Sequence, residues 1–120
     1  MMENAIRDKS FASALPAVKL AKYLEVQKRD FVLSKQVLRS GTAMGALVRE
    51  AEHAESRADF VHKLNIAVKE TNETMYWLDL LRQGDYLDKQ NYQSIAADSE
   101  ELIKLLIAIV KTSKVAKRSG

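Results

Sequence analysis

A chain of 120 residues has the length of one domain, and its composition, 47% apolar and 29% charged, allows it to bury a core. Four glycines and one proline are too few for the many tight turns of an all-β protein. With no cysteine, the sequence excludes disulfides, zinc–thiolate sites and thiol nucleophiles. The net charge of +3 makes nucleic acid a partner to consider.

Four segments with apolar residues at three- and four-residue steps predict α-helices at about 10–28, 31–54, 57–82 and 88–114. The positions expected to face inward in the first helix are Phe11, Ala14, Leu15, Val18, Ala21 and Leu24. Pro16 either lies near the true start of this helix or kinks it.

Residues typical of helix ends separate these segments. Asp30 and Ser56 are expected to cap the second and third helices, and Asp88 to start the fourth. Gly84 suits a left-handed cap at the end of the third helix. No segment alternates with a period of two, so we expect an all-α protein in which residues 1–120 form one antiparallel up-down four-helix bundle.

The stretch SGTAMGA at 40–46 places Gly41 and Gly45 one turn apart on one face of the second helix. Each glycine costs a helix interior about 0.5–1 kcal/mol relative to alanine. A face without bulk lets a neighbouring helix approach closely, so we expect both residues to be helix-packing positions. The alternative is that the helix simply tolerates them.

The last helix has more apolar surface than an outer helix of a lone bundle needs, because Leu102, Leu106 and Ile109 form one stripe and a second runs beside it. This excess predicts a closed homo-oligomer. The residues expected at the subunit interface are Ile103, Ile107, Val110 and Tyr76.

Two acid-x-x-His pairs, Glu50 with His53 and Asp59 with His62, have the spacing of di-iron bundle ligands. Both are expected to point away from the inner face, so we expect no metal site and no cofactor. The polar stretch KETNETMYW at 69–77 lacks a nucleophile or a phosphate cradle. We therefore expect no catalytic residues and no enzymatic activity.

Two groups of basic residues are candidates for binding nucleic acid. The tail at 111–120 contributes Lys111, Lys114, Lys117 and Arg118, and the end of the first helix contributes Lys19, Lys22, Lys28 and Arg29. A lysine-rich tail also complements the helix dipole and favours solubility, which is the alternative explanation for it.

The stretch LRSGTAMGALVREAEHAESRADFVHKLNIAVKETNETMYWLDLL at 38–81, followed by EELIKLL in the last helix, resembles the four-helix-bundle proteins encoded by intervening sequences of bacterial large-subunit ribosomal RNA genes. The accessory variability-determinant proteins of diversity-generating retroelements are similar. The resemblance implies a bundle that assembles into a ring, typically a homopentamer. It also implies RNA or DNA and a reverse transcriptase as partners of the retroelement members, and places Arg39, Arg49 and Glu50 in the shared motif.

The sequence therefore predicts a non-enzymatic, oligomeric, accessory bundle that binds nucleic acid weakly. The alternative is a structural or protein-interaction module with no nucleic-acid partner. The first residues, MMENAIRDKS, lack an apolar signal core, and the longest apolar run, at 105–110, is far shorter than a membrane span. We expect a cytoplasmic protein with no membrane partner.

Overall fold

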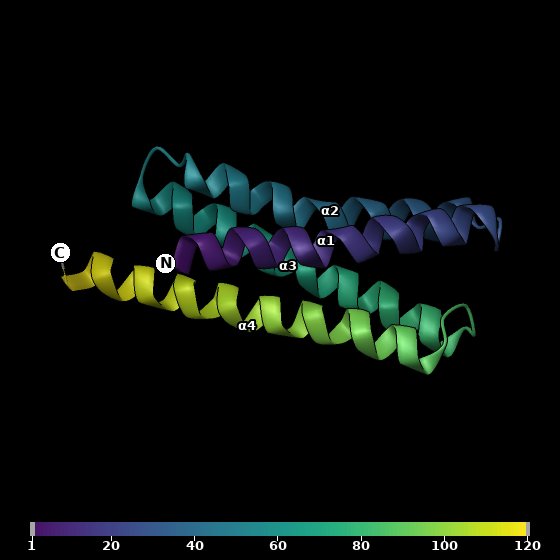
Figure 1. Ribbon diagram of the computed structural model, residues 1–120. Coiled ribbons are helices and arrows are strands. Elements are labelled where there is room, and N and C mark those ends of the chain that lie inside the picture. The colour runs from purple at the N-terminus through teal and green to yellow at the C-terminus, as the bar shows by residue number, and fades with distance from the viewer. Residues whose placement is uncertain (1, 120) are drawn as a thin grey trace.

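The computed structural model describes residues 2–119, and the side chains of residues 5–114, as four helices with no strand in that range. The helices are α1 (Met2–Val26), α2 (Phe31–Glu52), α3 (Arg57–Gln83) and α4 (Lys89–Ser119). They lie along one long axis of a body measuring 52 × 23 × 20 Å. The α1–α2 and α3–α4 turns lie at one end, and the α2–α3 turn lies at the other (Figure 1).

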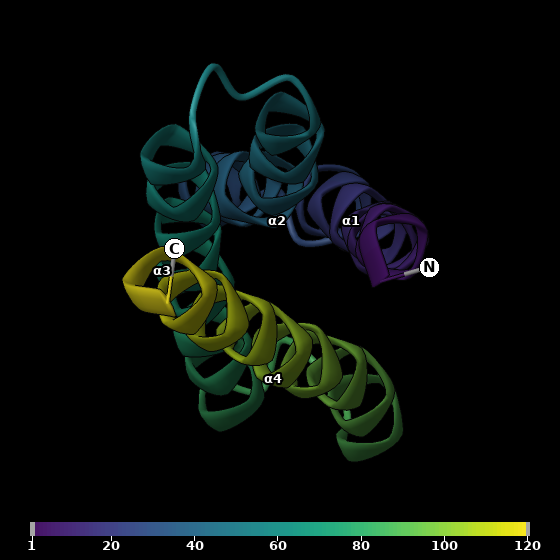
Figure 2. The same ribbon diagram turned by 90° about the vertical axis from the view of Figure 1, so that its left-hand side faces the viewer.

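Each helix packs against the two helices that flank it, whereas no Cα atoms of the diagonal pairs α1–α3 and α2–α4 come within 8 Å of each other. The α1–α2 contact is the most extensive and the α1–α4 contact the least. Viewed along the long axis, α1, α2, α3 and α4 follow one another around the bundle (Figure 2). The outer surfaces of α1 and α3 therefore face opposite ways.

The predicted caps start three of the helices. Asp30 and Ser56 accept hydrogen bonds from the backbone N–H groups three residues further on, at 2.9 and 3.0 Å. Asp88 does the same at 2.8 Å. These side chains satisfy N–H groups that have no partner within the helix, which fixes where each helix begins.

The end of α3 differs from the prediction. Gly84 has an ordinary φ of −85°, and the left-handed residue is Asp85, with φ 63°. The N–H of Tyr86 donates to the carbonyl of Leu81 at 2.9 Å, and that of Asp85 to the carbonyl of Arg82 at 3.3 Å. This is the hydrogen-bond pattern of a Schellman motif, displaced by one residue from the glycine.

The first helix begins at Met2, eight residues before the predicted start, so Pro16 lies in the interior of α1. The predicted inner face is also wrong in part. Phe11, Leu15 and Val18 are exposed, while Ala21 and Leu24 are buried as expected. The residues of α1 that are buried are Ile6, Ser10, Ser13, Ala17, Leu20, Ala21 and Leu24. Four of these seven residues are serine or alanine, and Ala17 lies where α1 comes closest to Gly41 of α2.

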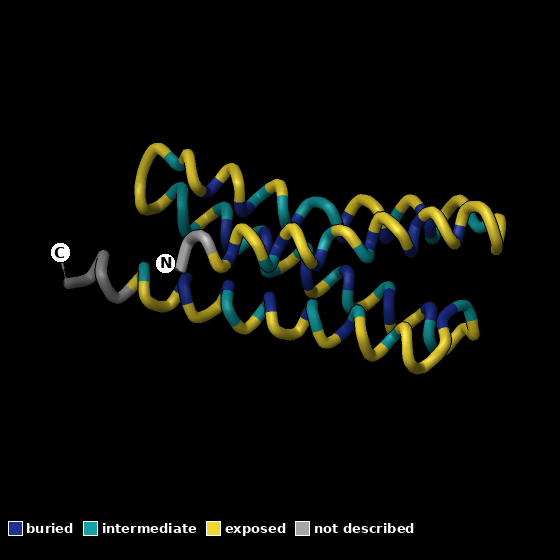
Figure 3. Tube along the Cα trace, viewed as in Figure 1, coloured by how far each residue is buried: buried dark blue, intermediate teal, exposed yellow. Residues whose placement is uncertain are grey.

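Buried apolar residues form two separate clusters, one toward each end of the bundle. Between them, all four helices contribute a layer of buried hydroxyl side chains, which we call the hydroxyl waist. Its members are Ser10, Ser13, Ser40, Thr71, Thr74 and Ser99. In Figure 3 buried positions recur along each helix, with exposed positions between them.

Hydrogen bonds satisfy most of the waist. The Thr74 hydroxyl lies 3.0 Å from Ser40 Oγ and 2.9 Å from a carbonyl one turn back, and the Thr71 hydroxyl donates to the Ala67 carbonyl at 2.7 Å. Ser13 Oγ is buried without a partner. Bonding to the preceding turn is how Ser and Thr are accommodated inside a helix.

Candidate functional site

The two glycines of α2 both face α1. A Cβ atom placed on Gly41 would lie 2.3 Å from the Cβ of Ala17, well inside van der Waals contact. At Gly45 the nearest atom would be the carbonyl oxygen of Ser10, at an ordinary 3.6 Å. The close approach of helices that the sequence predicted is therefore present at Gly41, while Gly45 has room for a methyl group.

Ion pairs join α2 to α3 along the surface. Arg39 pairs with Glu70 at 3.1 Å and with Glu73, and Trp77 Nε1 donates to Glu73 at 3.0 Å. Glu73 thus pairs with a residue of the neighbouring helix and not with Lys69, which lies one turn before it on α3. These contacts link α2 to α3 along the surface of the bundle.

The other two motif residues lie elsewhere. Glu50 pairs with Lys63 at 3.1 Å, further along the α2–α3 seam. The guanidinium of Arg49 lies 5.7 Å from the ring centroid of Phe11 on α1, in cation–π geometry. Arg49 therefore belongs to the α1–α2 surface rather than to the ion pairs of α3.

Residues 5–114 contain no group of three or more His, Cys, Asp or Glu side chains placed to hold a metal ion. Glu50 is engaged by Lys63, and Asp59 accepts a hydrogen bond from the N–H of Glu55 at 3.2 Å. His53 and His62 are exposed. Within residues 2–119, no helix has the length and apolar composition that a membrane span requires.

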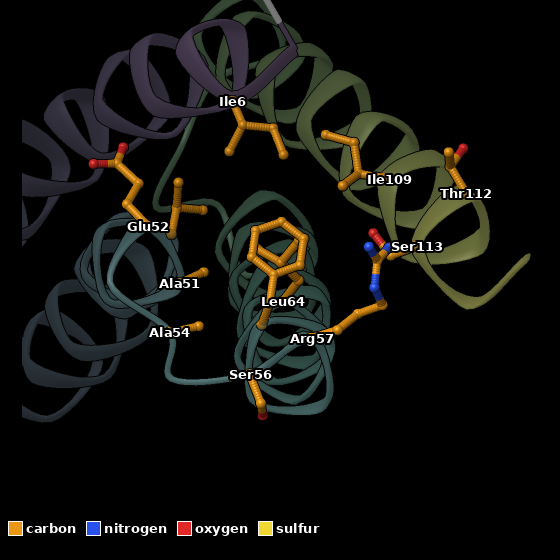
Figure 4. A pocket seen from close by; sticks show the side chains of 12 residues that line it. Ile6, Ala51, Glu52, Ala54, Ser56, Arg57, Leu64, Ile109, Thr112 and Ser113 are labelled. Atoms are coloured by element: carbon orange, nitrogen blue, oxygen red, sulfur yellow. The ribbon is translucent and has the colours of Figure 1, made fainter. Parts of the chain in front are cut away.

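A cavity of about 680 Å³ opens at the end of the bundle where the α2–α3 turn lies (Figure 4). Its floor is apolar and includes Ile6, Leu64 and Ile109, and polar residues lie at its rim. The side chain of Arg57 extends from α3 toward Ser113 on α4.

The two basic groups lie at opposite ends of the bundle. Lys28 and Arg29 are in the α1–α2 turn, with Lys19 and Lys22 one to two turns before it, whereas Lys111 is near the end of α4 (Figure 1). A basic residue that the sequence reasoning missed, Lys35, joins the first group from the second turn of α2. Lys35 is the fifth residue of the helix predicted at 31–54, so its closeness to the turn could have been inferred from the sequence.

In these two basic groups, every side chain that the structure describes is exposed, and none takes part in an ion pair within residues 5–114. Lys114 is the last basic residue whose side chain lies in that range. The side chains of Lys117 and Arg118 lie outside the described range. Each end of the bundle therefore presents cations to solvent, and the two ends cannot contact the same short stretch of a ligand.

The predicted interface residues divide into two kinds. Tyr76 is 55% exposed and Ile107 38% exposed, and Ile103 is half-buried. Val110 is 6% exposed and packs in the apolar cluster near the α2–α3 turn, so its place at a subunit surface is wrong. Part of the second apolar stripe of α4 is therefore buried within the single chain.

The matching family model is that of the 23S rRNA-intervening sequence protein, over residues 2–108. The chain belongs to this family. Among solved structures, a protein of unknown function from the S23 ribosomal protein family of Bacteroides thetaiotaomicron is 54% identical, with a TM-score of 0.90. The similarity covers 92% of this chain and 99% of that one. No curated protein matches the chain.

Membership of the 23S rRNA-intervening sequence protein family agrees with the resemblance carried by the motif at 38–81. The motif spans both Gly41, at the contact with α1, and Arg39, at the contact with α3. In this chain, that stretch thus contains residues that pack α2 between its two neighbours.

Proposed function

We propose that this protein is a non-enzymatic accessory protein of the cytoplasm, an antiparallel up-down bundle that assembles as a homopentameric ring and binds RNA or DNA weakly. The observation that carries the proposal is the pair of exposed, unpaired basic groups at the two ends of the described bundle. A ring would repeat each group in every subunit, so that weak phosphate contacts act together.

Binding by these groups is electrostatic and has little sequence preference, because phosphate contacts position a protein without reading bases. Each contact that is made adds about 0.7–0.9 to the slope of log K against log salt concentration. Binding should therefore weaken steeply between about 50 and 200 mM salt. A reverse transcriptase is a further candidate partner, on the resemblance to the retroelement proteins alone.

Fluorescence anisotropy with labelled single-stranded and duplex RNA and DNA tests the proposal. One variant replaces Lys28 and Arg29 with glutamine, and another replaces Lys111 and Lys114. A control replaces Lys69, which is exposed on α3 away from both groups. A smaller salt slope in either end variant, with the control unchanged, identifies the end that binds.

The alternative function is a structural or protein-interaction module. The exposed apolar side chains of α1 and α2 favour it, because such side chains suit a protein surface better than a phosphate backbone. No binding of any of the four nucleic acids at 50 mM salt would make this alternative the better function. Equal binding in all variants would instead exclude the end groups as the binding site.

A further inference from the structure

The α1–α2 turn and the helix ends beside it concentrate the positive charge of the chain. Residues 19–35 contain five Lys and Arg against two Asp and Glu, a net charge of +3, which equals that of the whole chain. The α3–α4 turn at the same end (Figure 1) adds no net charge, because residues 82–89 contain two cations and two acids. None of these cations takes part in an ion pair within residues 5–114, so an anionic partner would find them free.

Two exposed aromatic rings lie among these cations. Phe31, the first residue of α2, is 62% exposed, and Tyr23, in the last turn of α1, is 40% exposed. Lys35 follows Phe31 by four residues and Lys19 precedes Tyr23 by four, so each ring has a cation one turn away on its own helix. Phe31 belongs to neither apolar cluster of the bundle, so its ring does not stabilise the core.

The backbone that carries Phe31 is held from several sides. The N–H of Asp30 donates to the carbonyl of Leu24 at 2.9 Å, and the Asp30 side chain caps α2. The hydroxyl of Tyr86 donates to Asp30 at 3.0 Å and ties this turn to the α3–α4 turn. Arg29 adopts a left-handed conformation, with φ 52°. Arg29 and Phe31 therefore project from a turn whose conformation is fixed before a partner binds, which lowers the entropic cost of binding.

An aromatic ring among cations distinguishes between kinds of nucleic acid. The phosphates of any strand can pair with the cations, whereas the ring gains by stacking on a base whose face is free. In a duplex the base faces are covered by neighbouring bases, and aromatic side chains stack on unpaired bases instead. The combination of exposed rings and unpaired cations therefore favours a single strand.

A membrane surface with anionic lipids would meet the same cations. At the turn, however, the exposed large apolar residues are Val26, Phe31 and Val32, and the next exposed residue of α2 in this direction is Lys35. An amphipathic helix that lies in a membrane interface needs an apolar face along its length. The described residues of α2 near the turn do not provide one.

We propose that the α1–α2 turn binds single-stranded nucleic acid, with a base stacked on Phe31 and the adjoining phosphates paired with Lys28, Arg29 and Lys35. The inference rests on the proposed function and narrows it to one end of the bundle and to unpaired strands. Stacking tolerates any base, because every base has a π-face, so this site adds affinity without reading sequence.

The test compares labelled oligothymidylate with an abasic strand of the same length, which has the same phosphates but no bases, and with a duplex. Fluorescence anisotropy measures binding by the wild type, Phe31→Leu and Phe31→Trp. Phe11→Leu is the matched control, because Phe11 is 57% exposed on α1 and lies outside the basic turn. All three substitutions are at exposed positions, so circular dichroism and light scattering should match the wild type.

The wild type should bind oligothymidylate at least about fivefold more tightly than the abasic strand, the low end of what one stacked base contributes. Phe31→Leu should lose this preference but keep the salt slope, since no cation is removed. Phe31→Trp and Phe11→Leu should keep both. If Phe31→Leu changes the mass in light scattering, the two strands still test stacking in the wild type, because that comparison needs no variant.

Several results would overturn the assignment. Equal binding of the two strands by the wild type excludes stacking, and a preference that survives in Phe31→Leu places it on another residue. Tighter binding of the duplex excludes a single-strand site. Phosphate binding by the basic groups stands in all three cases. Binding to phosphatidylserine vesicles that Phe31→Leu weakens, without a preference between strands, assigns the turn to lipid. No binding of any strand at about 50 mM salt removes both this site and the proposed function.

Discussion

Replacing Gly41 with alanine should destabilise the protein, although the same change normally strengthens a helix. The new Cβ would lie 2.3 Å from the Cβ of Ala17, and ordinary contact needs about 3.5–4 Å, so α1 must move outward by roughly 1–2 Å. Overpacking of this kind costs about 1–3 kcal/mol, and the gain in helix propensity returns about 0.5–1 kcal/mol. We expect a net loss of roughly 0.5–2 kcal/mol, or about 2–8 °C in Tm.

Two further variants make the test specific. Gly45→Ala should be neutral or stabilising by up to about 1 kcal/mol, because its Cβ has room beside Ser10. In an Ala17→Gly background, Gly41→Ala should become stabilising, since the opposing methyl group is gone. Thermal unfolding followed by circular dichroism, at one fixed protein concentration, gives all the values. If Gly41→Ala shifts Tm upward, or equally in both backgrounds, the contact with Ala17 does not limit the helix spacing.

Three other substitutions have expected outcomes. Ser13→Ala should raise the free energy of unfolding by about 1 kcal/mol, because it removes a buried hydroxyl that has no partner. A lower free energy of unfolding in urea titration would contradict this. Asp85→Gly should also stabilise by about 1 kcal/mol, since only glycine adopts φ 63° without steric cost, and an unchanged urea midpoint would argue against strain at that residue. The hydrogen bond from Tyr86 to Asp30, and then the negative charge of Asp30, raise the pKa of the Tyr86 hydroxyl above its usual 10.0. The stability that the protonated Tyr86 hydroxyl contributes is therefore complete below about pH 10 and is lost as the pH rises through the folded-state pKa. Urea titrations from pH 8 to 11 should therefore show a shallower alkaline decline in Tyr86→Phe than in the wild type, and identical slopes would exclude this linkage.

The sequence was sufficient to predict the number of helices and most of their ends. The cap residues Asp30, Ser56 and Asp88 each act through a hydrogen bond to the backbone three residues away, and such local interactions can be read from a short stretch of sequence. Asp85 escaped this reasoning because glycine is the usual left-handed residue, and Gly84 stands beside it. Asp tolerates that conformation well enough to take its place.

The face of α1 was harder to predict, because an apolar pattern shows only that one stripe is apolar. It does not show whether that stripe meets the core of the same chain or another surface. Phe11, Leu15 and Val18 have helical spacing, yet α1 turns Ser10 and Ser13 inward. Space decides the choice: next to Gly41 the gap between helices is too narrow for large side chains.

The candidate binding residues could be named from composition, but their grouping depends on the fold. Nothing local to Lys28 or to Lys111 indicates that one lies at each end of the bundle, because that separation follows from the path of the whole chain. Val110 was misplaced for a similar reason. The width of the inward-facing stripe on α4 depends on how far α4 stands from α1 and α3.

The hydroxyl waist has a consequence for how the helices are aligned along their common axis. Leucine-rich layers resemble one another, so a bundle built only from them could slide by one helical turn, about 5.4 Å, and find nearly equivalent contacts. In this protein a slip that moved Ser40 toward Leu78 would separate it from Thr74 and leave a buried hydroxyl against an apolar side chain. The hydroxyl waist, to which all four helices contribute, therefore distinguishes the native axial alignment from alignments displaced by one helical turn.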